Sequence, residues 1–161
     1  MIVIVMGVTG VGKTTVGQLV AEGTGWTLYD ADAYHSPANV EKMRAGIPLT
    51  DDDRWPWLDR LNALLREAES RGESAILACS ALKQRYRDRL QRGLQSARWV
   101  YLKGDIELIR SRLHKRKGHY MNPALLQSQF DALEPPAEAF LIDVNDEPAA
   151  LAQQVLAALA T

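Results

Sequence analysis

Short apolar runs alternate along this chain with stretches of helical periodicity. The runs that predict buried strands are 2–6, 26–29, 75–79, 99–102 and 140–144. Apolar residues spaced three or four apart predict helices from about residue 13 to 23, over 38–45 and 51–71, from residue 80, over 105–114 and 125–133, and at the end of the chain. Strands that alternate with helices in this way predict an α/β fold.

The first strand leads directly into GVTGVGKT, residues 7–14. A strand, a glycine-rich loop and a helix in this order predict a P-loop, whose backbone N–H groups and helix N-terminus bind the phosphates of a nucleotide. Lys13 is predicted to reach the outer phosphates, and the Thr14 hydroxyl to complete the shell of a magnesium ion. The predicted nucleotide-binding residues here are Gly7, Val8, Thr9, Gly10, Val11, Gly12, Lys13, Thr14 and Thr15.

Two carboxylates, Asp30 and Asp32, follow the second predicted strand. Ligands of open parallel sheets bind at the carboxyl ends of the strands, so both should lie near the P-loop. Alternation along an extended chain would direct them to the same side. One carboxylate could hold magnesium through water while the other accepts the proton of a substrate hydroxyl. Taken without the P-loop, the pair would instead indicate a turn or a helix cap.

Two helices between the second and third strands exceed what a simple crossover requires, so residues 34–72 predict a helical substrate-binding insertion. Thr50 or Asp51 is expected to cap the longer helix, and Asp51 and Asp52 are interpreted as a solvated turn with cap residues. Arg54 stands at the helix start, where the helix dipole disfavours a cation, and is therefore predicted to bind an anion.

The third strand ends without the acidic residue of an ordinary Walker B motif, so the metal would depend on Thr14, water and Asp30. The single cysteine, Cys79, is interpreted as a buried structural thiol. Further along, Arg112 and Arg116 stand on one side of a predicted helix. The basic stretch at about 115–123 is predicted to close over bound phosphates as a lid.

Composition narrows the class of protein. The chain has 161 residues, 47% of them hydrophobic, which suits one domain over 1–161. Its net charge of −1 gives no indication of nucleic acid or an anionic membrane as partner. The apolar runs are too short for a membrane span or a signal peptide, so a cytosolic protein is expected.

Four stretches resemble the P-loop gluconate kinases, which are related in fold to shikimate and adenylate kinases. They are MGVTGVGKTTV, DADAYHSPANVEKMRAGIPLTDDDRWPWL, CSALKQRYRDRL and YLKGD with SRLHKRKGHYMNPALLQSQFDALEPP. The resemblance implies a P-loop NTPase fold with a five-stranded parallel sheet flanked by helices, ATP-dependent phosphorylation of D-gluconate to 6-phosphogluconate, and a homodimer. It also implies Asp32 as the base, Arg112 against adenine and Arg116 as the lid arginine at the phosphates.

Gluconate carries a carboxylate and several hydroxyls, so its pocket needs hydrogen-bond donors. The candidates are His35, Arg54, Lys83 and Arg87, beside Asp32. A kinase for another small hydroxy acid or for a nucleotide is the alternative enzyme. A nucleotide-dependent switch protein is disfavoured because the NKxD and DxxG motifs of such proteins are absent from the sequence.

Overall fold

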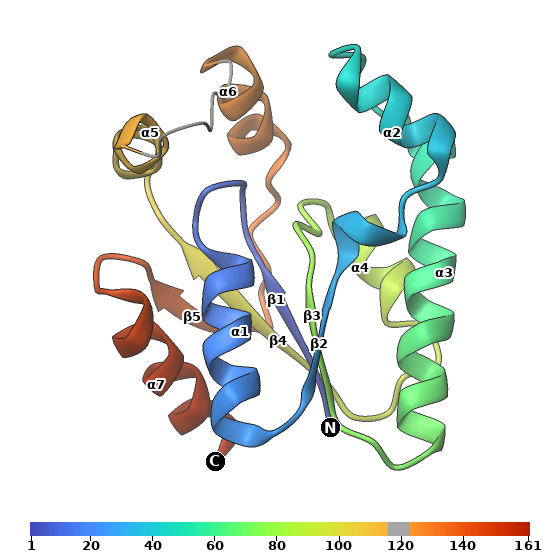
Figure 1. The fold of residues 1–161 in the computed structure, drawn as a ribbon, viewed down its shortest axis with the longest axis vertical. Helices are drawn as coiled ribbons and strands as arrows, with labels where there is room; N and C mark the ends of the chain where they lie inside the picture. Colours follow the sequence, from blue (N-terminus) through green and yellow to red (C-terminus); the bar gives the residue numbers. More distant parts are fainter. Residues whose placement is uncertain (116–122) are drawn as a thin grey trace.

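The computed structural model describes residues 1–115 and 123–161. Within these residues the chain forms a parallel sheet of five strands in the order β2-β3-β1-β4-β5, with helices on both faces (Figure 1). The α/β fold predicted from the sequence is therefore confirmed. The strands are β1 (Ile2–Met6), β2 (Thr27–Asp30), β3 (Ala75–Ala78), β4 (Ala97–Lys103) and β5 (Phe140–Asp143). The helices are α1 (Lys13–Thr24), the 3₁₀ helix η1 (Ala31–Tyr34), α2 (Pro37–Arg44), α3 (Asp51–Ser70), α4 (Gln84–Leu90), α5 (Ile106–Lys115), α6 (Pro123–Ala132) and α7 (Pro148–Leu159).

The central strand β1 is buried on both faces, and its side chains alternate between two apolar clusters. Val3 and Val5 face the cluster that contains the inner residues of α1 and α7. Ile2, Ile4 and Met6 face the cluster formed with α3 and α4. Figure 1 shows the same division, with α1 and α7 on one side of the sheet and α3 and α4 on the other. Two helical layers therefore fix β1, and with it the start of the P-loop.

The helix α3 begins with a capping box whose N-cap is Thr50, one of the two cap residues that the sequence predicted. The Thr50 hydroxyl accepts a hydrogen bond from the Asp53 N–H at 3.1 Å, and the Asp53 carboxylate accepts one from the Thr50 N–H at 2.9 Å. The Lys42 ammonium of α2 lies 2.8 Å from the same carboxylate. This joins the last turn of α2 to the first turn of α3, so α2 ends and α3 begins at one polar junction.

Two segments differ from the sequence-based prediction. Asp32 does not extend β2, because the chain turns into η1 after Asp30. The helix predicted from Ser80 begins only at Gln84, because Ala81 adopts a left-handed backbone with φ of 46° that an α-helix cannot contain. The 3₁₀ helix η1 thus follows β2 where an extended chain was predicted, and a loop precedes α4 where a helix was predicted. Both segments lie at the carboxyl edge of the sheet and carry predicted site residues.

Candidate active site

The loop between β1 and α1 has the backbone of a phosphate cradle. Gly10 has φ of +82°, and a Cβ atom there would lie 3.0 Å from Ile109 Cγ2 of α5. At Gly7 a Cβ atom would lie 2.7 Å from the Leu102 carbonyl oxygen of β4. Side chains are therefore excluded where the loop meets β4 and α5. Because Gly12 at the N-cap of α1 has no side chain to cap the helix, the first N–H groups of α1 are left for an anion.

Lys13 starts α1 and folds back over this loop. Its ammonium donates to the carbonyl oxygens of Gly7 and Val8, each at 3.0 Å. Burial lowers the pKa of Lys13, and the nearby Cys79, Asp32 and Asp30 side chains oppose that shift. The lysine is thus held at the loop before any phosphate binds, and both carboxylates after β2 act on it.

The two carboxylates have different positions although they are close in sequence. The half-buried Asp30 ends β2, and its Oδ1 accepts a hydrogen bond from the Asp32 N–H at 3.0 Å. Asp32 is exposed in η1. Asp30 therefore acts as the cap that orients the turn bearing Asp32. The cap interpretation is confirmed for Asp30, whereas the catalytic interpretation of Asp32, whose carboxylate is not part of this cap, stays a prediction.

His35 lies directly after η1 and stacks on Trp57 of α3, with ring centroids 4.1 Å apart and an angle of 18° between the rings. Trp57 in turn donates from Nε1 to the Ala31 carbonyl at 2.8 Å, which fixes η1 against α3. Burial lowers the pKa of His35, with Asp32 opposing the shift and Arg54 adding to it. A lowered pKa keeps the ring neutral at pH 7, so His35 can offer one N–H to a ligand.

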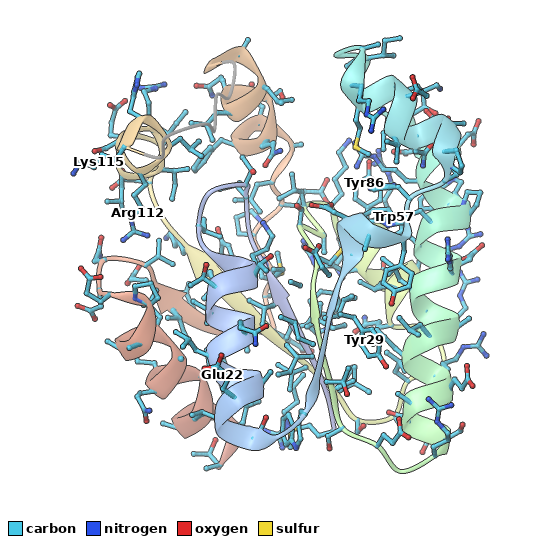
Figure 2. All side chains as sticks on the ribbon, viewed as in Figure 1. Glu22, Tyr29, Trp57, Tyr86, Arg112 and Lys115 are labelled. Atoms are coloured by element: carbon cyan, nitrogen blue, oxygen red, sulfur yellow. The ribbon has the colours of Figure 1, made fainter. Side chains whose placement is uncertain are left out.

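Two of the residues predicted to bind gluconate lie near the ring of Tyr86 in α4. The Arg54 guanidinium lies 5.2 Å and the Lys83 ammonium 6.0 Å from the centre of its ring. Its hydroxyl donates to the Asp51 carboxylate at 2.6 Å, and Arg85 lies 2.8 Å from the other oxygen of that carboxylate. In Figure 2, Trp57 and Tyr86 lie near each other on the α3 side of the sheet. The sequence interpretation missed Tyr86, whose only signal was its place in CSALKQRYRDRL.

Arg54 retains bonding capacity within this group. One terminal nitrogen donates to the Leu49 carbonyl at 3.4 Å, a long hydrogen bond. Its Nε is buried and has no hydrogen-bond partner among the described residues. A buried donor without a partner is unfavourable, so an anion reaching Arg54 would satisfy it. That Arg54 binds an anion stays a prediction from its position at the start of α3.

Arg87 was also predicted to bind gluconate, but it does not belong to the group of side chains around Tyr86. It is 3% exposed. Its guanidinium donates to the carbonyls of Ala81 and Leu82 at 2.7 and 3.1 Å, to Gln84 Oε1 at 3.0 Å and to the Glu134 carbonyl at 2.7 Å. This network favours a structural role, in which Arg87 holds the loop between β3 and α4.

On the nucleotide side, Arg112 of α5 donates to the Val144 carbonyl just after β5. Figure 2 shows its side chain directed from α5 toward the connection between β5 and α7. Arg116 and most of the predicted lid at 115–123 lie outside the described residues. A residue that the sequence did not indicate is Gln129 of α6, whose Oε1 accepts a hydrogen bond from the Thr9 N–H of the P-loop at 2.7 Å.

The end of β3 offers no carboxylate, as the sequence predicted. Cys79 is buried there, and burial raises the pKa of its thiol to about 12, so the thiol stays protonated. A divalent ion bound with the nucleotide would therefore find oxygen ligands at the exposed Thr14 hydroxyl and at Asp30. These two residues suit an ion that keeps most of its waters.

Comparisons with known proteins show the family of this chain. A family model described as an AAA domain matches residues 2–136. A probable gluconokinase of Rattus norvegicus is 46% identical, and the match covers 98% of this chain and 97% of that protein. The chain belongs to the gluconokinase family.

Solved structures place this gluconokinase-family chain among P-loop kinases. A sugar kinase of Janibacter sp. HTCC2649 superposes with a TM-score of 0.91 at 45% identity over 99% of this chain and 94% of that one. A gluconokinase of Sinorhizobium meliloti 1021 gives 0.87 at 41% identity, over 98% and 90%. Shikimate kinase of Acinetobacter baumannii, at 21% identity and a TM-score of 0.60 over 99% and 92%, shares the fold, as the sequence resemblance implied.

Proposed function

We propose that this chain transfers the terminal phosphoryl group of ATP to the terminal hydroxyl of D-gluconate and releases 6-phosphogluconate and ADP. The observation that carries the proposal is that Lys13, at the end of the loop after β1, and the carboxylates of Asp30 and Asp32, after β2, lie at the same carboxyl edge of the sheet, where burial lowers the pKa of Lys13 and both carboxylates oppose that shift. A phosphate-binding cation and a pair of carboxylates at one edge of a sheet support phosphoryl transfer to a hydroxyl. The sequence similarity to gluconokinases supports gluconate as the acceptor.

We assign residues 7–15 and Arg112 to the donor half of the site. Loop N–H groups and the N-terminus of α1 neutralise phosphate charge, and Lys13 exchanges its two carbonyl partners for phosphate oxygens. We assign Thr14 and Asp30 to magnesium, which when bound neutralises charge on the outer phosphates. Arg112 is assigned to the adenine side, and Arg116 remains a prediction from the sequence.

The acceptor half begins with Asp32. Its carboxylate takes the proton of the gluconate hydroxyl as the hydroxyl oxygen forms its bond to the γ-phosphorus, and the bond from that phosphorus to the β–γ bridging oxygen breaks. Arg54, Lys83 and the neutral His35 are assigned to the carboxylate and hydroxyls of gluconate. Arg87 is assigned to holding the loop that carries Lys83.

A substrate panel tests this function. ADP production would be measured by a coupled assay with gluconate, related sugar acids, other small hydroxy acids and nucleoside monophosphates. We expect gluconate to give the highest kcat/KM and a product phosphorylated at its terminal carbon. Preferred phosphorylation of a different hydroxy acid or of a nucleotide would contradict the assignment while leaving a kinase. ATP hydrolysis unaffected by every acceptor would contradict a kinase altogether.

The cytosolic location and the homodimer remain predictions. In the described part of the chain, no helix has the length and apolar character needed to cross a bilayer. Sedimentation of the purified chain at several concentrations would measure its assembly directly.

A further inference from the structure

The helix α6 and the residues just after it contact two of the loops assigned to the proposed reaction, the P-loop and the loop between β3 and α4. Figure 1 shows α6 above the apex of the loop between β1 and α1. Leu126, 2% exposed, belongs to the same apolar cluster as Val8 and Val11 of that loop. Apolar packing therefore fixes α6 against the P-loop, and its polar side chains have defined positions from which to bond.

One contact is to the phosphate loop. Gln129 Oε1 accepts the Thr9 N–H at 2.7 Å, across 120 residues of sequence. Thr9 lies between Gly7 and Gly10 of the P-loop. Because its N–H donates to Gln129, this N–H points to α6 and not toward a bound phosphate. The bond holds the apex of the loop, and a held loop needs less ordering when ATP binds.

The other contact is to the loop between β3 and α4. Glu134 Oε1 accepts the Gln84 N–H at 2.8 Å, and the Glu134 N–H donates to the Leu82 carbonyl at 2.8 Å. Leu82 and Gln84 are the two neighbours of Lys83, so Glu134 fixes the backbone on both sides of that lysine. Arg87 strengthens the junction by donating to the Glu134 carbonyl at 2.7 Å.

We infer that Gln129 and Glu134 are positioning residues, the first for ATP at the P-loop and the second for the acceptor at Lys83. Neither touches a substrate in this assignment. Each acts through a loop backbone that it holds, and the two effects should separate by substrate. The acceptor half rests on the function proposed above, whereas the nucleotide half requires only that the P-loop binds ATP.

The nucleotide half is tested with Gln129→Met, which keeps the length of the side chain and removes the acceptor. We expect a dissociation constant for ATP, measured by calorimetry, about fivefold or more above that of the parent, the scale of one lost hydrogen bond. The KM for gluconate should change less than twofold. Gln127→Met is the matched control, because Gln127 is exposed on the same helix and bonds to Asp131 at 2.9 Å.

The acceptor half is tested with Glu134→Ala, which removes the bond to the Gln84 N–H and the carboxylate charge near Arg87 and keeps the two backbone bonds of Glu134. We expect the KM for gluconate to rise about threefold to tenfold, with the ATP dissociation constant within twofold of the parent. Glu134→Gln keeps an acceptor at the same place and should restore the parent KM. Rescue by glutamine is a result that a general loss of stability would not produce.

Several outcomes would overturn the inference. Folded variants with unchanged ATP affinity and unchanged gluconate KM, whatever their Tm, would leave both residues purely structural. Equal effects of Gln127→Met and Gln129→Met would remove the specific role of the Thr9 bond. If the parent protein does not phosphorylate gluconate, the proposed function fails and the acceptor half fails with it, while ATP affinity still decides the role of Gln129.

Discussion

At the scale of single residues, the site depends on charges whose surroundings differ sharply. Lys13 is held by two carbonyl oxygens, Asp30 caps a turn and Asp32 is exposed beside them. These three residues are close together, but their hydrogen bonds differ, and we propose a different role for each. Each role leads to a different expected response to substitution.

Lys13→Met removes the ammonium and keeps most of the aliphatic side chain. We expect kcat to fall by about 10²-fold or more, because the charge that meets the phosphates in the transition state is lost. Because burial lowers the pKa of Lys13, its charged form destabilises the folded state in full below that lowered pKa, and the penalty is relieved as the pH rises from the lowered pKa to the ordinary value of 10.5. Thermal unfolding at pH 7 should therefore show a Tm that is unchanged or higher. A folded variant with near-normal turnover would contradict the P-loop assignment.

Asp32→Asn should lower kcat by about 10²-fold or more, the usual scale for a positioned base, with little change in ATP affinity. Asp30→Asn keeps an acceptor for the Asp32 N–H and should instead raise the magnesium concentration needed for half-maximal rate. Asp30→Ala removes the cap as well, so its kcat should fall further than that of the asparagine variant. Steady-state kinetics over a magnesium series measures all three. Recovery of the Asp32 variant at high magnesium, with the Asp30 variants inactive throughout, would reverse the two assignments.

At the scale of secondary-structure elements, polar junctions set where helices start and how loops are held. The capping box at Thr50 and Asp53 begins α3 and receives Lys42 from α2. The bonds of Glu134 and Arg87 hold the loop before α4. These junctions fix the backbone that carries Arg54 and Lys83.

The capping box should make stability depend on pH in a defined range. The bond from Lys42 and those from Thr50 lower the pKa of Asp53 to about 2. A carboxyl whose pKa is lowered on folding stabilises the protein above its unfolded pKa of about 4, and this contribution is lost as the pH falls from about 4 to about 2. Asp53→Asn should therefore show a smaller drop in Tm between pH 5 and pH 3 than the parent.

Asp52→Asn is the control for that experiment, because Asp52 is exposed in the same helical turn. It should keep the drop of the parent. Equal drops in the parent and in both variants would show that the capping box does not contribute to the pH dependence.

At the scale of the whole molecule, the sheet brings distant segments to one edge. The loops after β1, β2 and β3 all leave the carboxyl ends of neighbouring parallel strands, since β1 pairs with β3 and β3 with β2. The P-loop, the carboxylates and the Lys83 loop are therefore adjacent although they span much of the sequence. Ligand binding at this edge should stabilise the domain as a unit.

ATP with magnesium at about 100 times its dissociation constant should stabilise the folded state by about 2.7 kcal/mol, which corresponds to a rise in Tm of roughly 5–10 °C for a domain of this size. The same addition should have little effect on Lys13→Met, which lacks the phosphate-binding charge. Differential scanning calorimetry with and without nucleotide measures both shifts. An equal rise in the parent and in Lys13→Met would place the nucleotide away from the P-loop.

The sequence by itself determined the parts of this protein that depend on neighbours along the chain. Apolar periodicity predicted the strands and most helices, and GVTGVGKT predicted the P-loop between β1 and α1, because strand, loop and helix are contiguous. A cap at Thr50 or Asp51 was predicted for the same reason, and the structure has it at Thr50. The resemblance of four sequence stretches to gluconate kinases also predicted the family, which the comparisons confirmed.

Only the tertiary structure decided which distant side chains meet. Gln129 accepts a hydrogen bond from Thr9, and the Tyr86 ring contacts Arg54 and Lys83. Arg87 instead donates to oxygen atoms of the protein, among them the Glu134 carbonyl. The turn into η1 has a local cap at Asp30, but only the tertiary structure shows that Trp57 of α3 holds it by bonding the Ala31 carbonyl. Such contacts follow from strand order and helix packing, and a local pattern carries no information about which remote donor will find which acceptor.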